Sequence, residues 1–221
     1  MRDEITASLE RCVRIRPAAC AARAVAALLH ELRGERAASD RVALQAAEEA
    51  VGAGTARKTP WLARRAARRE ERDQAFRWLE YGVDASRAAT TVQLLEARCE
   101  IVAELELWDL DKEAIADARR FAELALVDAL PLYADRLERR AALAGGDLDL
   151  ALHALTRARE GFAALDARWD EAVTCLWLAE AKRATGADDQ ARAEAERALR
   201  VFDELRSVRE LEHARSLLAG S

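Results

Sequence analysis

The sequence predicts an all-α protein built as an α-α superhelix, a solenoid of antiparallel helical hairpins. Alanine, leucine, arginine and glutamate, which favour helix, dominate a chain of 221 residues with only 3 prolines and 9 glycines. Few segments alternate with the two-residue period of a strand. The stretch 130–206 contains two copies of one helical hairpin, 40 residues apart, and a fixed period of this length is typical of stacked repeats.

The N-terminal part of the chain predicts four helices with recognisable ends. The first covers 3–15 and stops before Pro17, because the residue before proline avoids helical geometry. The next three cover 17–33, 40–52 and 60–82, the last opened by Thr59 and Pro60. Residues 1–84 are expected to form degenerate repeats or an N-terminal helical cap.

Amphipathic patterns then predict a helix over 86–108 and another that starts at 109 or 111 and ends near 129. Two hairpins follow, which are listed here with the final helix: 131–144 with 148–165, 169–185 with 188–206, and 207–221 as a C-terminal capping helix. No linker is long enough to separate domains. We therefore expect a single helical repeat domain over 1–221, whose best-defined repeats are about 131–166 and 169–206.

The 40-residue register sets the expected packing. GDLDLA at 146–151 recurs as GADDQA at 186–191, and the matched small residues are Ala151 with Ala191 and Ala158 with Ala198. We expect these alanines at crossings between neighbouring helices, with Phe162 and Phe202 filling the gaps between hairpins. Gly161 lies inside a helix, at a cost of about 1 kcal/mol against alanine, and we expect a close helix crossing there, under Trp169 or Trp177.

At these positions the chain resembles the tetratricopeptide repeat. The last repeat matches that family's pattern at Leu178, Ala179, Gly186, Ala191 and Ala198, and the one before it at Gly146, Asp147, Ala151 and Ala158. It departs at Arg139, where the family has a small residue, in lacking the family's proline, and in its period of 40 instead of about 34. It is most similar to the long variant of kinesin light chains and of maltose-regulator-type (LuxR-like) bacterial activators. The resemblance implies a right-handed superhelix whose concave face binds a peptide or another protein.

We therefore expect a protein–protein interaction scaffold of tetratricopeptide type, the docking or sensing part of a bacterial regulatory system. Four scattered cysteines without a CxxC pair and a charged N-terminus without a signal region indicate the cytoplasm. No apolar run is long enough for a membrane. The net charge of −5 argues against nucleic acid as the partner.

One stretch favours a different function. No acidic residue occurs from Ala50 to Arg69, and the same stretch contains a candidate binding patch made of Arg57, Lys58, Arg64, Arg65, Arg68 and Arg69. In the first interpretation, the basic helix 57–72 binds nucleic acid or another anionic ligand. In the second, the arginines pair internally with the acidic stripe of the next helix, which consists of Glu96, Glu100 and Glu104. The sequence leaves both open.

The residues indicate no catalytic, cofactor or metal site, and we expect no enzyme. The segment 52–59 approaches a phosphate loop, but Arg57 replaces its second glycine and a helix, not a strand, precedes it. His30, His153 and His213 lie on different predicted helices without the spacing of metal ligands. No nucleophile motif is present.

Overall fold

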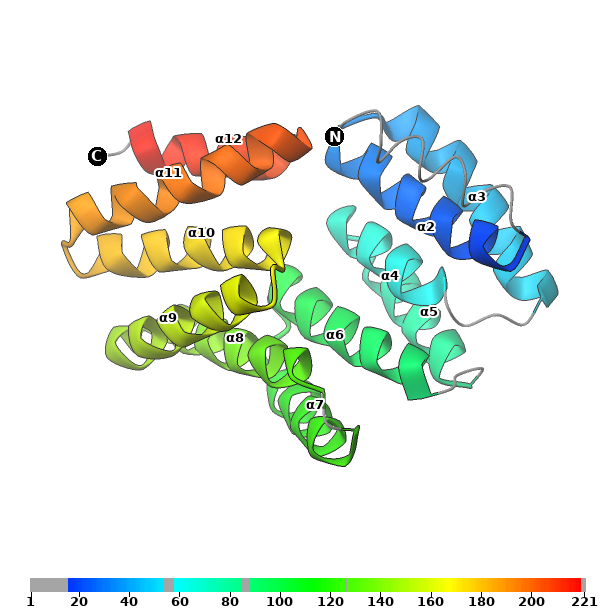
Figure 1. Cartoon of the computed structure of the whole chain (residues 1–221), viewed down its shortest axis with the longest axis horizontal. Coiled ribbons are helices and arrows are strands. Elements are labelled where there is room, and N and C mark those ends of the chain that lie inside the picture. The colour runs from blue at the N-terminus through cyan, green and yellow to red at the C-terminus, as the bar shows by residue number, and fades with distance from the viewer. Residues whose placement is uncertain (1–15, 54–57, 85–87, 126, 220–221) are drawn as a thin grey trace. The chain divides into compact units, whose positions relative to one another are not determined.

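The computed structural model describes residues 16–53, 58–84, 88–125 and 127–219. Regular structure in these residues consists of eleven α-helices, labelled α2 to α12 (Figure 1). The all-α prediction is confirmed. The helix predicted over 3–15 lies outside the described residues.

The chain divides into two compact units, Met1–Leu105 and Glu106–Ser221. The described helices of the first unit are α2 (Arg16–Leu32), α3 (Arg36–Ala53), α4 (Thr59–Arg68), α5 (Arg72–Asp84) and α6 (Ala88–Glu104). α2 packs against α3 and α4, and α4 packs against α5 and α6. One uninterrupted repeat domain over 1–221 stays a prediction.

The single helix predicted over 60–82 is wrong, because the chain turns in its middle. α4 ends at Arg68 and α5 begins at Arg72. Glu70 adopts a left-handed conformation (φ 61°), and the Glu71 N–H donates to the Ala66 carbonyl oxygen at 3.0 Å. Neither glycine nor proline marks this turn in the sequence, so the break between α4 and α5 could not be predicted from local residue types.

The second unit is a solenoid in which each helix packs against the next (Figure 1). Its helices are α7 (Asp111–Ala125), α8 (Ala129–Ala144), α9 (Leu148–Ala164), α10 (Arg168–Ala184), α11 (Asp188–Leu205) and α12 (Val208–Ala219). The two predicted hairpins correspond to α8 with α9 and α10 with α11. Their bounds agree with the prediction to within two residues.

The buried faces of α7, α9 and α11 share one 40-residue register. The four alanines predicted at crossings, Ala151, Ala158, Ala191 and Ala198, are all at most 3% exposed. The buried side chains of α7 fall on the same register, although the sequence showed the repeat only weakly there. The matched buried residues are Ala114, Ile115, Ala118 and Ala122 in α7, Ala154, Leu155, Ala158 and Phe162 in α9, and Glu194, Ala195, Ala198 and Phe202 in α11.

Aromatic rings fill the space between paired helices. Phe162 is fully buried, with its ring edge-to-face to Tyr133 at 5.2 Å between centroids, and Phe202 meets Trp169 in the same way at 5.2 Å. Gly161 lies at a close crossing as expected, but not under a tryptophan. A Cβ atom there would lie 2.5 Å from Cδ2 of Leu132 on α8, so a leucine explains this glycine.

Most turns between helices are built the same way. A left-handed residue follows the helix, and two backbone N–H groups reach back to its last carbonyl groups. After α10, the Gly186 N–H donates to the Arg183 carbonyl and the Ala187 N–H to the Lys182 carbonyl, both at 2.9 Å. The left-handed residues in the described part of the chain are Gly34, Glu70, Glu106, Gly146, Asp166, Gly186 and Arg206.

Candidate functional site

The predicted basic patch lies at the start of α4 and along it. Arg57 is outside the described residues. Lys58 directly precedes α4 and is completely buried, and its Nζ lies 3.3 Å from Oε2 of Glu49 on α3. Arg64, Arg65 and Arg68 of α4, and Arg69 directly after it, are all half-buried. The described side chains of the patch are therefore partly or fully buried within the first unit.

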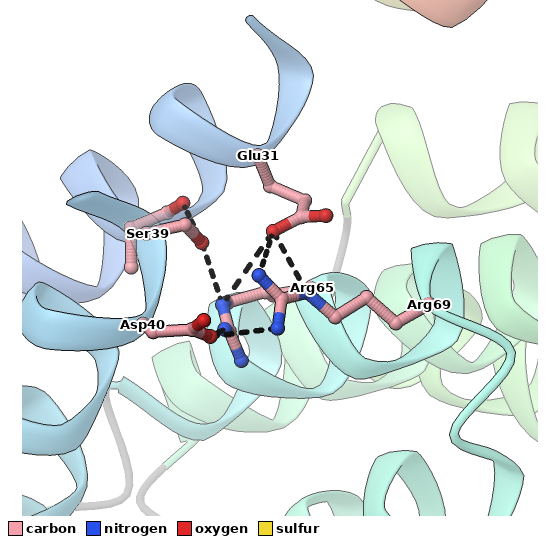
Figure 2. Close-up of polar contacts among 6 residues, drawn as sticks. Glu31, Ser39, Asp40, Arg65 and Arg69 are labelled. Carbon is pink, nitrogen blue, oxygen red and sulfur yellow. Dashed lines mark hydrogen bonds and ion pairs between the residues drawn. The ribbon is translucent and has the colours of Figure 1, made fainter. Parts of the chain in front are cut away.

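Arg65 and Arg69 converge on residues of the α2–α3 hairpin (Figure 2). Arg69 donates to Oε2 of Glu31 through Nε at 2.8 Å and Nη2 at 2.6 Å, and to Oδ1 of Asp40 through Nη1 at 2.6 Å. Arg65 also pairs with Asp40, and its Nε donates to Oγ of Ser39 at 2.7 Å. Ser39 in turn donates to the Ala27 carbonyl oxygen at 2.9 Å. The cluster thus ties α4 to both helices of the preceding hairpin.

The protonation of this cluster follows from its geometry. Burial by itself would raise the pKa of Glu31, but the hydrogen bonds from Arg69, with the charges of both arginines, hold it below its usual value. The hydrogen bond from Arg69 likewise lowers the pKa of Asp40. The hydrogen bond to Glu31 raises the pKa of Arg69. The carboxylates and guanidinium groups therefore stay charged and paired near neutral pH.

Arg64 confirms part of the internal-pairing interpretation. It pairs with Glu100 on α6, one of the three glutamates expected to serve this role, and its guanidinium lies 5.0 Å from the Trp61 ring centroid. Arg65 and Arg69 use Glu31 and Asp40 instead. Sequence reasoning missed these two carboxylates because they lie on α2 and α3, which precede α4, whereas the predicted partners were on the helix that follows it.

A second buried polar cluster joins α9, α10 and α11. Glu194 of α11 is 4% exposed, and its Oε1 accepts from Arg159 of α9 at 2.9 Å and from Lys182 of α10 at 2.8 Å. Burial opposes the charge, but the hydrogen bond and charge of Lys182, with Arg159, lower the pKa of Glu194. In the 40-residue register, α7 and α9 have alanine at this position. Glu194 therefore departs from the repeat, and the positive charges of Arg159 and Lys182 compensate its buried negative charge.

The thiol of the cysteine beside this cluster is unreactive near neutral pH. Cys175 is fully buried, and burial, followed by the negative charge of Glu194, raises the pKa of its thiol to about 12. The thiolate, which is the nucleophilic and metal-binding form, is therefore absent near neutral pH. Cys99 is also buried.

Arg136 of α8 occupies an aromatic cage. Its side chain is 3% exposed, and its guanidinium lies 4.8 Å from the ring centroids of Tyr133 and Phe162 and 5.5 Å from that of Trp177. Nη1 lies 2.9 Å from Oδ1 of Asp170 on α10. This buried cation joins the two hairpins through ring contacts and one ion pair. Sequence reasoning expected Phe162 to fill a gap between hairpins, but identified neither Tyr133 nor the arginine between the rings.

The described residues contain no group of three or more histidine, cysteine, aspartate or glutamate side chains arranged to hold a metal ion. In the same part of the chain, none of the helices combines the length and apolar character that crossing a bilayer requires.

Comparisons of the chain with protein-family models, with curated proteins and with solved structures found no match. The resemblance to the tetratricopeptide repeat therefore rests on the residues quoted above and on the hairpins they form.

Proposed function

We propose that the chain is a protein-binding scaffold of tetratricopeptide type, which docks or senses another protein in a bacterial regulatory system in the cytoplasm. The observation that carries the proposal is the common buried register of α7, α9 and α11. Alanine at these crossings lets helices approach closely, and hairpins stacked with a constant offset build one extended surface. Surfaces of this kind suit an extended segment or a helix of another protein.

The first helices of the hairpins, α8 and α10, supply the proposed contact surface. Trp177 of α10 is half-buried, and the guanidinium of Arg140 lies 5.6 Å from its ring centroid. Tryptophan and arginine are the residues over-represented among those that dominate binding energy in protein interfaces. A partly accessible tryptophan stacked with an arginine is therefore the described feature best suited to anchor a partner.

The basic patch supports the alternative function less well. A nucleic acid or other anionic ligand at Arg65 and Arg69 would have to compete with Glu31 and Asp40, which already pair with these guanidinium groups. Lys58 is completely buried. These contacts favour the internal-pairing interpretation of the patch.

The test is affinity capture with the full chain from lysate of its own cells, followed by reconstitution. We expect one captured protein, purified separately, to bind saturably, and Trp177→Ala to weaken its affinity at least tenfold, equivalent to about 1.4 kcal/mol. Arg192→Ala, at an exposed position of α11, should leave the affinity unchanged. If Trp177→Ala proves less folded by circular dichroism, Trp177→Phe replaces it. Capture of no protein, together with a small molecule that raises the melting temperature, would contradict the proposal.

A further inference from the structure

Glu180 links its own helix, α10, to both α8 and α12. Its Oε2 accepts from Nη1 of Arg140 on α8 at 2.6 Å, and its Oε1 lies 2.9 Å from Nε2 of His213 on α12. The side chain of Glu180 is 22% exposed and that of His213 is 40% exposed. One carboxylate therefore bridges a permanent cation and a cation whose charge depends on pH.

α12, which contains His213, packs against the α10–α11 hairpin and covers its outer face. Ala214 of α12 is completely buried in one cluster with Ala172 and Cys175 of α10 and Ala198 and Phe202 of α11. The half-buried residues Leu211 and Leu217 extend this contact. Movement of α12 away from this site would expose Phe202 and its neighbours to solvent.

The charged groups around His213 come from each helix near it. α10 presents Glu180 and Arg183, and Arg183 donates to the Leu217 carbonyl oxygen of α12. α8 contributes Arg140, which also lies 3.6 Å from Glu106. α11 meets α12 through the apolar residues Ala198 and Phe202. α12 itself has Arg209, Glu210, Glu212 and Arg215 near the histidine in sequence.

The carboxylate that faces His213 keeps its charge between pH 6 and 8. Burial would raise the pKa of Glu180, but hydrogen bonds and charges from His213 and Arg140 lower it below its usual value, so this carboxylate stays ionised. Arginines do not titrate in this range. A histidine ordinarily does.

We propose that α12 is a pH-dependent cap, which the His213–Glu180–Arg140 bridge holds more tightly onto the α10–α11 hairpin when His213 is protonated. Protonated His213 forms an ion pair with Glu180 in addition to the hydrogen bond. Neutral His213 keeps at most the hydrogen bond. Opening of α12 therefore becomes more frequent as the pH rises through the range in which the imidazole loses its proton.

Hydrogen exchange of the full chain tests this proposal. Protection of the α12 backbone amides is measured at pH 6 and pH 8, corrected for the intrinsic pH dependence of exchange, and compared with protection of α8. We expect α12, but not α8, to lose about two- to five-fold in protection at pH 8. His213→Gln retains a side-chain N–H donor without a charge and should give equal protection at both pH values.

Two further variants make the outcome decisive. His213→Lys keeps a positive charge at both pH values, so α12 protection should be independent of pH and at least as high as in the Gln variant. His153→Gln, at an exposed position of α9, should leave the pH dependence of α12 unchanged. The proposal is overturned if the wild-type chain and His213→Gln have the same pH dependence, or if protection of α8 falls with that of α12.

Discussion

The left-handed residues after the helices show how single positions define this fold. Gly146 and Gly186 occupy this conformation after α8 and α10, with φ of 84° and 77°. Asp166 and Arg206 occupy it after α9 and α11, with φ of 54° and 57°. A side chain with a Cβ atom costs about 1–2 kcal/mol in this region, and glycine avoids that cost. The turns without glycine are therefore strained relative to the turns with it.

Arg206→Gly should stabilise the protein. We expect the free energy of unfolding to rise by about 0.5–1 kcal/mol, because relief of the left-handed strain exceeds the extra freedom that glycine gives the unfolded chain. Urea denaturation measures the change. The matched reverse variant is Gly186→Ala, for which no atom lies within 4 Å of the added Cβ, so only backbone strain acts and stability should fall by about 1 kcal/mol. Equal stabilities of both variants and the wild-type chain would contradict this account.

The sequence reveals only those turns that glycine marks. Gly146 and Gly186 were recognised in the sequence from the repeat, but Glu70 and Arg206 follow no local rule. The polar contacts show the same limit. Arg64 and Glu100 were paired because they lie on helices predicted to follow each other in the chain, whereas Glu31 lies on α2 and Arg69 directly after α4, with α3 between them. Local patterns contain no information about such a contact until the hairpins are placed.

At the scale of the helix, small side chains set how closely neighbours approach. Ala118, Ala158 and Ala198 occupy the same register position in α7, α9 and α11, and each is at most 1% exposed. The crossing has no space for a larger side chain. Either the helix would have to move, or the side chain would have to leave its preferred rotamer. The constant offset between hairpins depends on these positions.

Ala198→Leu should destabilise the second unit, whereas Ala193→Leu on the same helix should not. Ala198 is completely buried against Phe202 and Ala214, and overpacking of this kind costs about 1–3 kcal/mol. Ala193 is exposed, where leucine is accommodated within about 0.5 kcal/mol. Thermal and urea unfolding of both variants measure the difference. Similar stability of the two would mean that the alanine register does not determine the packing.

The elements that the sequence predicts well are those with both a period and a marked end. The hairpins of α8 with α9 and α10 with α11 have a repeat, a glycine turn and a clear apolar stripe, and their bounds were predicted to within two residues. α3 begins at Arg36, four residues before the predicted start at residue 40, where Asp40 is the type of residue that caps a helix; its carboxylate instead pairs with Arg65 and Arg69. Tertiary pairing thus overrode a local signal.

At the scale of the whole chain, stability depends on carboxylates that are paired with cations in both units. Burial would raise the pKa of Glu31 and Glu194, but their cationic partners lower it in each case. Hydrogen bonds from Arg119 lower the pKa of Glu138 in the same direction. A carboxylate with a lowered pKa in the folded state stabilises that state above its unfolded pKa near 4.5 and loses this contribution as the pH falls through its folded pKa. The free energy of unfolding should therefore fall steeply below about pH 4.5, as urea titrations at pH 3, 4, 5 and 6 would measure.

The alkaline limit of stability should come in part from one thiol. The pKa of Cys175 is raised from 9.0 in the unfolded chain to about 12 in the folded one, so the folded state holds the proton more tightly. Its contribution is complete below pH 9 and is lost as the pH rises from 9 towards 12, at about 1.4 kcal/mol per pH unit for one proton. Urea titrations at pH 8, 9, 10 and 11 should show this slope for the wild-type chain. Cys175→Ala lowers the starting stability by removing buried volume, but its alkaline slope should be shallower by one proton. Parallel curves for the two proteins would show that this thiol titrates alike in the folded and unfolded chain, and the buried position of Cys175 would then have to be reconsidered.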